Sequence, residues 1–245
     1  MQSKVIVITG ASAGIGAETA KLLGAEGHKI VLAARREIEL KDVAAKSGED
    51  ALTVACDVTK RDEVDALKDA ALNHFGHVDV WINNAGRGIE KRVLELSDDD
   101  VDQIIAVNVK SVLYGIQAII PHFKERSQGH LINISSFLGK VPYVSFRSVY
   151  SAAKAAVNSL TTNLRMDLKD TYPNINVSLV MPGRVLTAFH KNSLGSGHEA
   201  MLPASGMAKP QTAAEVAAVI VATIKNPQPE VFTNPAMLEI LARTK

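Results

Sequence analysis

The chain has 245 residues, 47% of them hydrophobic and 22% charged, and its 27 Lys plus Arg residues nearly balance 26 Asp plus Glu residues, for a net charge of +1. Charge this balanced excludes electrostatic binding to nucleic acid or to an anionic membrane as the main activity. The ordinary hydrophobic content excludes a disordered or fibrous chain, and the length fits one large domain.

Short β-branched apolar runs alternate with longer helical patterns along the chain. The predicted strands are Val5–Ile8, Ile30–Ala34, Leu52–Cys56, Val78–Ile82, His130–Ile134, Val177–Met181 and Glu230–Thr233. The predicted helices are Ile15–Glu26, Glu37–Lys46, Lys60–Phe75, Asp98–Arg126, Val149–Tyr172 and Thr212–Lys225. Almost continuously apolar strands are typical of a parallel sheet that helices cover on both faces. The alternation predicts the α/β class: one domain with a doubly wound parallel sheet of about seven strands.

One irregular stretch, Gly183 to Pro210, interrupts this alternation. It is too long for a simple connection. We therefore expect a substrate-binding loop at about 183–210.

A glycine-rich turn, Thr9 to Gly16, follows the first strand and opens the first helix. Glycines in such a turn let the backbone approach a pyrophosphate, and the free N–H groups of the helix N-terminus favour its negative charge. The spacing here is G-x-x-x-G-x-G, which differs from the general G-x-G-x-x-G pattern. Taken alone, the motif also fits a tight turn without a ligand.

Four motifs, in this order, resemble those of the short-chain dehydrogenase/reductase family, in the branch whose chains are near this length. They are Thr9–Gly16 for T-G-x-x-x-G-[IL]-G, Asn83-Asn84-Ala85-Gly86 for N-N-A-G, Tyr150 with Lys154 for Y-x-x-x-K, and Pro182-Gly183 with Thr187 for P-G-x-x-x-T. The resemblance covers about Lys4 to Thr233. It implies a Rossmann fold and hydride transfer between a nicotinamide cofactor and a carbonyl or alcohol.

The residues after the second strand indicate which dinucleotide binds. In this fold an acidic side chain at that position accepts hydrogen bonds from the adenosine ribose and selects NAD. Here the position is Ala34, and Arg35 and Arg36 follow it. An arginine pairs with a 2′-phosphate, which a carboxylate would repel. We therefore predict NADP(H) over NAD(H), with Arg35 as the main phosphate contact and Ser12 assisting. Whether Arg35 or Arg36 dominates stays open, and Glu37 could reach the ribose if the strand ended later.

The resemblance also implies the other cofactor contacts, including adenine contacts from the residues after the third strand. The full predicted set is Gly10, Ser12, Gly14, Ile15, Gly16, Arg35, Asp57, Val58, Asn84, Ala85, Gly86, Tyr150, Lys154, Pro182, Gly183, Val185 and Thr187. Asn83 is expected to have a structural role.

Tyr150 is the one tyrosine of four that has a lysine, Lys154, four residues later on a helical pattern. Residues so spaced share a helix face. A nearby ammonium lowers the pKa of a phenol, which makes the phenol usable as a general acid or base. The resemblance implies that Lys154 also binds the nicotinamide ribose. Without the other motifs, an ordinary packed helix pair would be the simpler interpretation.

Two further residues complete the predicted catalytic set. The family's serine usually lies thirteen residues before the tyrosine, where this chain has Phe137, so Ser136 implies one extra residue in the following loop. Ser136 would hydrogen-bond the substrate carbonyl oxygen. Ser135 competes for this role, but neighbouring strand residues point to opposite faces. Asn108 matches the family's helix asparagine, which implies a water held in a proton relay to Lys154; a structural hydrogen bond is the alternative.

The substrate wall is predicted to be apolar, which favours a hydrophobic ketone or alcohol, reduced with NADPH from carbonyl to alcohol. Its predicted residues are Phe137, Val141, Tyr143, Phe146, Leu186, Phe189, Leu194, Met201, Leu202 and Met207. Two long helices, Asp98–Arg126 and Val149–Tyr172, carry wide apolar faces. The resemblance implies that they form a homo-dimer or homo-tetramer.

The single cysteine, Cys56, excludes an intrachain disulfide and fits a reducing compartment. No signal-peptide pattern opens the chain, and the longest apolar stretch, Val216 to Ile224, is too short to span a bilayer. We expect a cytoplasmic protein without a membrane or nucleic-acid partner. The seven histidines show no ligand spacing, so no metal is expected.

Three other functions stay open. A non-catalytic NADP(H)-sensing binding protein, or a scaffold, would not need Asn108, Ser136, Tyr150 and Lys154 together. A 3-oxoacyl-carrier-protein reductase is disfavoured because no concentrated basic patch is evident for an acidic carrier protein.

Overall fold

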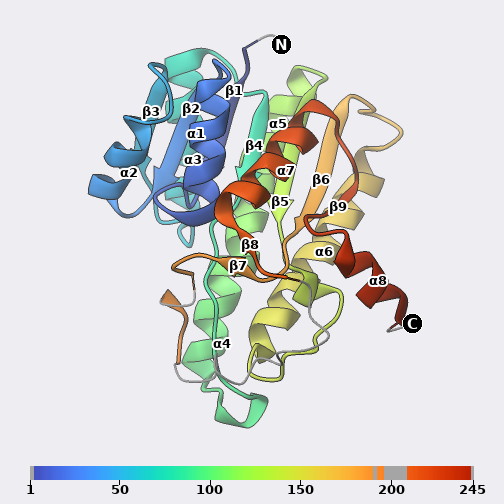
Figure 1. Ribbon diagram of the computed structural model, residues 1–245. Coiled ribbons are helices and arrows are strands. Elements are labelled where there is room, and N and C mark those ends of the chain that lie inside the picture. The colour runs from blue at the N-terminus through green and yellow to red at the C-terminus, as the bar shows by residue number, and fades with distance from the viewer. Residues whose placement is uncertain (1–2, 190–191, 196–208, 244–245) are drawn as a thin grey trace.

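The computed structural model describes residues 3–189, 192–195 and 209–243. Its centre is a seven-stranded sheet with the order β3-β2-β1-β4-β5-β6-β9, in which every strand pair is parallel (Figure 1). This is a doubly wound, Rossmann-type order, in which the chain moves outward from β1 in both directions. The predicted fold class is confirmed.

Each predicted strand has its counterpart in the sheet. The strands are β1 (Val5–Thr9), β2 (Lys29–Ala34), β3 (Ala51–Ala55), β4 (Val80–Asn83), β5 (Gly129–Ile134), β6 (Ile175–Met181) and β9 (Glu230–Phe232), and β7 (Val185–Leu186) pairs with β8 (Gln211–Thr212) outside the main sheet. The helices are α1 (Gly14–Ala25), α2 (Glu37–Ala44), α3 (Arg61–Phe75), α4 (Asp98–Ile105), α5 (Ser111–Glu125), α6 (Ser148–Leu168), α7 (Ala213–Lys225) and α8 (Ala236–Arg243). Shorter turns are η1 (Val93–Glu95), η2 (Ala106–Lys110) and η3 (Phe137–Gly139).

The strands are apolar throughout because both faces of the sheet are buried. Along β1, Val5 and Val7 pack in the layer that contains α3, α5 and α6, whereas Ile6 and Ile8 pack in the layer that contains α1, α2 and α7 (Figure 1). Since successive side chains point to opposite faces, each β1 side chain enters one of two hydrophobic layers. The sheet is therefore a rigid platform, and its carboxyl edge carries the loops.

The predicted helix Asp98–Arg126 is interrupted. Ser97 begins it with a capping box, in which its hydroxyl accepts from Asp100 N and the Asp100 carboxylate accepts from Ser97 N. The helix then contains the π-helical turn η2 before it continues as α5. A π turn adds one residue to a helical turn and is frequent at functional sites. The prediction of one regular helix was wrong at η2.

Among the described residues, one helical run, Asp98–Glu125, has the length and apolar content of a membrane span. Half of its most apolar window is buried inside the protein. That burial is typical of a core helix, and α5 supplies Val112, Ile116 and Phe123 to the hydrophobic layer described above.

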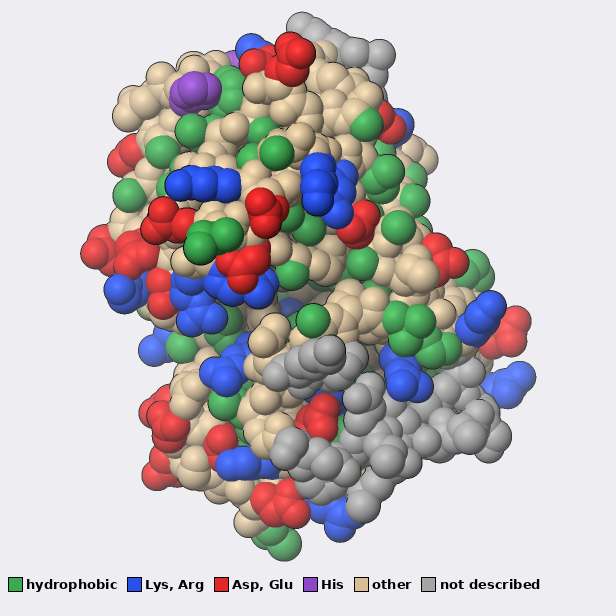
Figure 2. Space-filling view, turned by 60° about the vertical axis from the view of Figure 1, so that its left-hand side comes forward, with side chains coloured by type: hydrophobic (Ala, Val, Ile, Leu, Met, Phe, Trp, Pro, Cys, Tyr) green, Lys and Arg blue, Asp and Glu red, His purple; other side chains and the backbone are tan. Residues whose placement is uncertain are grey.

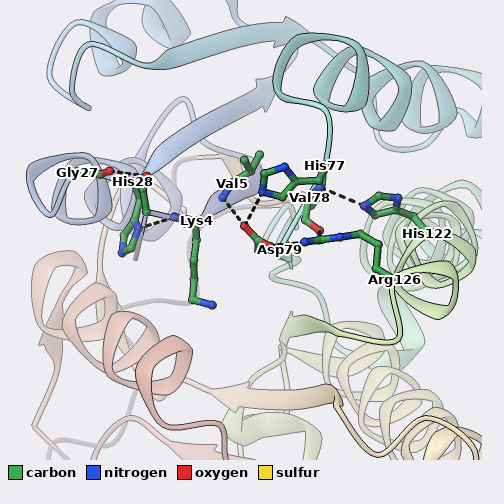
Figure 3. Close-up of polar contacts among 10 residues, drawn as sticks. Lys4, Val5, Gly27, His28, His77, Val78, Asp79, His122 and Arg126 are labelled. Carbon is green, nitrogen blue, oxygen red and sulfur yellow. Dashed lines mark hydrogen bonds and ion pairs between the residues drawn. The ribbon is translucent and has the colours of Figure 1, made fainter. Parts of the chain in front are cut away.

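Side-chain bonds to the backbone hold the amino edge of the sheet, opposite the loops (Figure 3). The Asp79 carboxylate accepts from Val5 N at 2.9 Å and from the Arg126 guanidinium at 3.1 Å. The same guanidinium donates to Val78 O at 2.6 Å. These bonds join the starts of β1 and β4 to the end of α5.

Two histidines at this edge accept backbone hydrogen bonds through a ring nitrogen (Figure 3). His122 Nε2 accepts from Val78 N at 3.2 Å, and His28 Nδ1 accepts from Lys4 N at 3.1 Å. An imidazole can accept only when it is neutral. Burial lowers the pKa of both His28 and His122, which keeps them neutral.

The burial of a third histidine, His130, makes the free energy of unfolding depend on pH. His130 is 5% exposed, lies 2.8 Å from Ser178 Oγ, and burial lowers its pKa from 6.5 to about 4. Between these values the unfolded chain binds more protons than the folded chain. The contribution of neutral His130 to the free energy of unfolding is therefore fully present above pH 6.5. It decreases, by about 3 kcal/mol, as the pH falls through about 4.

We expect His130→Gln to flatten the fall in the free energy of unfolding over this pH range, measured by urea denaturation. The exposed His74 provides the control, since His74→Gln should keep the wild-type slope. An unchanged slope in His130→Gln would show that another group carries the effect.

Candidate active site

A cavity of about 970 Å³ opens along the carboxyl edge of the sheet. Ligand cavities in proteins range from about 300 to 1,000 Å³, so this one suits a large ligand. The glycine-rich turn, the ends of β2 to β6, helix α6 and the loop after β6 all line it. Figure 2 shows a hollow between the upper and lower parts of the molecule, with Lys and Arg side chains on both sides of it.

The glycine-rich turn has no room for a side chain at Gly10 or Gly16, because the segment after β4 packs directly on these two residues. Gly10 has φ +67, and a Cβ there would lie 2.8 Å from Ala85 Cα. A Cβ on Gly16 would lie 2.6 Å from Asn84 Nδ2, which donates to Thr9 O at 2.9 Å. Gly10 and Gly16 therefore let the turn pack closely on the segment after β4, and Gly10 and Gly14 line the cavity without side chains, as close approach of a phosphate requires.

Helix α1 begins at this turn without a side-chain cap, because its N-cap residue is Ala13. Within the part of the chain that the structure describes, no side chain caps its first N–H groups, and Ala13 and Gly14 line the cavity. A bare helix N-terminus beside a bare glycine turn fits a pyrophosphate. The residues present thus suit the implied dinucleotide.

Two arginines line the cavity just after β2, which ends at Ala34 as predicted. Arg36 Nη2 donates to Ser12 Oγ at 3.0 Å. This bond joins the segment after β2 to the glycine-rich turn. Arg35 lies near Asp57. Burial alone would raise the pKa of the Asp57 carboxyl. The hydrogen bonds with Thr59 and the charge of Arg35 hold this pKa below its ordinary value. Both guanidiniums thus lie at the end of the cavity that the turn and β3 form, and Arg36 also pairs there with Glu39 at 3.3 Å.

Helix α6 contributes Tyr150 and Lys154 to the cavity wall. Both side chains are almost fully buried, and Lys154 Nζ donates to Ile134 O at 2.9 Å. The same nitrogen lies 5.8 Å from the centroid of the Tyr150 ring. The spacing of four residues therefore places the amine beside the Tyr150 ring, as expected from a shared helix face.

The expected direction of the Tyr150 pKa was wrong for this structure. Burial raises the pKa of the phenol, and a hydrogen bond with Ser136 and the charge of Arg147 oppose the rise. Burial also lowers the pKa of Lys154 to about 8. The opposing contributions come from Ser136 and Arg147, whereas the Lys154 amine bonds the Ile134 carbonyl.

The two candidate serines differ in their bonds. Ser136 makes a hydrogen bond with Tyr150, and its hydroxyl accepts from Leu138 N at 3.2 Å. Ser135 Oγ instead lies 2.5 Å from Asn158 Oδ1 and 3.2 Å from Lys154 O, and its one hydrogen donates toward these two acceptors. Its hydroxyl is thus directed to α6, and the geometry favours Ser136 as the group beside the phenol.

Asn108 lies in the π turn and is fully buried behind the cavity wall. Its Nδ2 donates to Arg87 O at 2.9 Å and to Ile104 O at 3.0 Å, while its Oδ1 accepts from Arg87 N at 3.3 Å. A Cβ on Gly86 would lie 2.9 Å from this oxygen and 3.6 Å from Lys154 Nζ. The side chain thus anchors the segment beside the lysine; its role in a water relay stays a prediction.

The predicted cofactor contacts lie together, with one exception. The cavity wall includes Gly10, Ser12, Gly14, Ile15, Arg35, Asp57, Val58, Asn84, Ala85, Gly86, Tyr150, Lys154, Pro182, Gly183, Val185 and Thr187. Gly16 is absent from the wall because it lies behind the turn, against Asn84.

The predicted substrate wall is only partly correct. Phe137, Tyr143, Leu186 and Phe189 line the cavity, whereas Val141, Phe146 and Leu194 do not. Met201, Leu202 and Met207 lie outside the described residues. Polar residues that the prediction missed also line the cavity: Arg87, Gln103, Arg147, Arg184, Asn192 and Ser193. The available signal was position, since Arg87 follows the N-N-A-G motif and Arg147 lies three residues before Tyr150.

Comparisons with known proteins agree with this geometry. The family model described as short chain dehydrogenase matches residues 4–195. An uncharacterized oxidoreductase of Staphylococcus saprophyticus is 43% identical over 188 residues, which cover 76% of each chain.

Solved structures with the same fold contain either nicotinamide dinucleotide. A short chain dehydrogenase/reductase from Burkholderia phymatum, in complex with NAD, has a TM-score of 0.86 and 29% identity and covers 98% of this chain and 92% of its own. An alcohol dehydrogenase from the archaeon Thermococcus sibiricus, complexed with 5-hydroxy-NADP, has a TM-score of 0.81 and 27% identity, with 94% and 96% covered.

Proposed function

The chain belongs to the short chain dehydrogenase family of oxidoreductases, and from this membership we propose that it reduces the carbonyl group of an apolar ketone or aldehyde with NADPH. The observation that carries the proposal is the convergence of Tyr150, Lys154 and Ser136 on the same cavity as the glycine-rich turn. When bound, the dinucleotide supplies the hydride. The protein holds the carbonyl and supplies one proton.

Tyr150 is the proposed proton donor. Burial raises its pKa, so the phenol is protonated near neutral pH and suits an acid in the reducing direction. Its hydroxyl proton passes to the carbonyl oxygen, and the nearby Lys154 ammonium stabilises the phenolate that remains. Ser136 hydrogen-bonds the same oxygen as negative charge develops on it.

The preference for NADP(H) rests on the residues around the end of β2. Ala34 is small and buried there, so no carboxylate stands at the ribose position. Ser12, Arg35 and Arg36 line the cavity beside it and would hold a 2′-phosphate. Glu37 begins α2 and is exposed, beyond the end of the strand.

Other parts of the proposal rest on the cavity wall and on the family. The rings of Phe137, Tyr143 and Phe189 support an apolar substrate. We propose one domain with a substrate loop at about 183–210, and a homo-dimer or homo-tetramer formed through α5 and α6. The free, buried thiol of Cys56 supports a cytoplasmic location.

The test is a panel of apolar ketones and aldehydes, run with purified protein and with NADPH or NADH. We expect loss of the reduced-nicotinamide absorbance with NADPH and at least one apolar carbonyl. Dinucleotide binding without turnover across the panel would favour the NADP(H)-sensing protein. Turnover confined to an acyl-carrier-protein thioester would favour the 3-oxoacyl reductase.

A further inference from the structure

Three segments that are distant in the sequence meet beside Tyr150. They are residues 87–91 after β4, the start of α6, and the described substrate-loop residues 187–189 and 192–195. Glu90 N donates to Leu194 O at 2.7 Å, and Leu194 N donates to Gly88 O at 3.0 Å. Ser148 Oγ donates to Lys91 O at 2.6 Å. Backbone bonds therefore join the loop to the first segment, and the first segment to α6.

One guanidinium connects all three segments. Arg147, at the start of α6, pairs through Nη2 with Glu90 Oε1 at 3.1 Å. Its Nη1 donates to Ser193 Oγ at 3.2 Å and lies 3.4 Å from Ile89 O. The Arg147 side chain is 13% exposed and the Glu90 side chain 5% exposed, so water screens the pair poorly.

The absence of a side chain at residue 88 leaves the space for this junction. A Cβ on Gly88 would lie 2.5 Å from Ser193 Oγ, 2.6 Å from Arg147 Nη1 and 2.8 Å from Phe189 Cε1. The arginine, the serine and the aromatic ring are therefore packed around one backbone position. A shift of the arginine would disturb the other two.

The junction reaches the proton donor in two ways. The Phe189 ring packs edge-on against the Tyr150 ring, with 5.8 Å between the centroids. Arg147 lies one helical turn before Tyr150, and its charge lowers the pKa of the phenol against the effect of burial. The other groups that face the phenol in the described structure are Lys154 on α6 and Ser136 after β5.

We propose that the buried Glu90–Arg147 pair is a positioning device, which holds the substrate loop against Tyr150 and keeps a positive charge beside its phenol. Neither side chain needs to touch the reacting atoms. The proposal rests on the proposed function, because it concerns the same proton donor. It goes further by assigning residues outside the four motifs to the control of this step.

The test compares Glu90→Gln, Arg147→Met, Arg147→Lys and the double variant Glu90→Gln/Arg147→Met, using a neutral ketone that the wild type reduces. Loss of either partner loosens the loop, so we expect KM to rise roughly ten-fold to a hundred-fold. The Kd for NADPH, measured by fluorescence, should stay near the wild-type value. The double variant should lose no more than Arg147→Met, because both changes break the same pair.

The pH profile of kcat separates positioning from a loss of folding. Reduction needs the Lys154 ammonium and the protonated phenol, so activity falls first near pH 8, where Lys154 loses its proton, and again at higher pH, as the pH rises through the raised pKa of Tyr150; the second fall is the alkaline limb that reports the phenol. Removing the positive charge in Arg147→Met should move this alkaline limb to higher pH. Glu90→Gln leaves the Arg147 guanidinium without its carboxylate partner and should move the alkaline limb of the Tyr150 phenol to lower pH. Arg147→Lys keeps a positive charge and should give an alkaline limb close to that of the wild type.

Arg92→Met is the control, because Arg92 directly follows residues 87–91, is exposed and does not line the cavity. It should match the wild type. Unchanged KM and pH profiles in the Glu90 and Arg147 variants of an active enzyme would overturn this inference and leave the proposed function intact. A loss confined to substrates with an anionic group would also overturn it, because Arg147 would then be a substrate ligand. A wild type without turnover would instead overturn the proposed function.

Discussion

Tyr150→Phe is expected to reduce kcat for carbonyl reduction by at least about 100-fold, since general acid catalysis contributes about 10² to 10⁴ in rate. The substitution removes the hydroxyl that donates the proton and keeps the ring that packs against Phe189. The Kd for NADPH and the thermal stability should therefore change little. Steady-state kinetics and cofactor fluorescence on the same preparation measure the two effects separately.

Tyr143→Phe is the matched control. Tyr143 also lines the cavity, and burial raises the pKa of its phenol as well, but the residue four positions later is Arg147 and not a lysine. Its variant should keep kcat near the wild-type value. Full activity in Tyr150→Phe, or a comparable loss in Tyr143→Phe, would remove Tyr150 from the proposed role.

The double variant Arg35→Ala/Arg36→Ala is expected to weaken NADPH binding by roughly 10- to 100-fold, because hydrogen bonds to charged groups contribute about 1.5–3 kcal/mol. Binding of NADH, which has no 2′-phosphate, should change little. The two single variants would show which guanidinium dominates. Since Arg36 already contacts Ser12, its loss should also release that hydroxyl.

Lys41→Ala supplies the control for net charge, because Lys41 is exposed on α2 and does not line the cavity. It should leave the Kd values of both dinucleotides near those of the wild type. An equal loss of NADPH and NADH affinity in the double arginine variant would contradict the proposed phosphate site.

The sheet could be predicted because burial on both faces leaves a strong sequence pattern. Continuous apolar runs marked β1, β2 and β5, and the end of β2 at Ala34 placed the two arginines correctly. The π turn could not be predicted, because one extra residue between Ile105 and Ser111 barely changes a helical pattern. The four motifs indicated the candidate site. Where a glycine or an amide packs so closely that another side chain would clash, few residue types fit the position, so the motif can be recognised in the sequence.

The electrostatics of the site could not be predicted from spacing. The i and i+4 positions of Tyr150 and Lys154 indicate that the groups meet, but the pKa of each depends on burial by other elements. Arginines in loops usually extend into water, so nothing local indicated that Arg147 would be buried against Glu90. The direction of loop side chains such as Val141 is likewise a tertiary property.

The most direct test of the central claim follows the hydride itself. Purified protein is given an apolar ketone and NADPH in which both hydrogens at C4 of the nicotinamide are replaced by deuterium, and the alcohol product is analysed by mass spectrometry. We predict one deuterium on the carbinol carbon of the wild-type product, and almost no product from Tyr150→Phe. Product without the label, or bound NADPH that stays unconsumed across the carbonyl panel, would contradict the proposal that this chain is a carbonyl reductase.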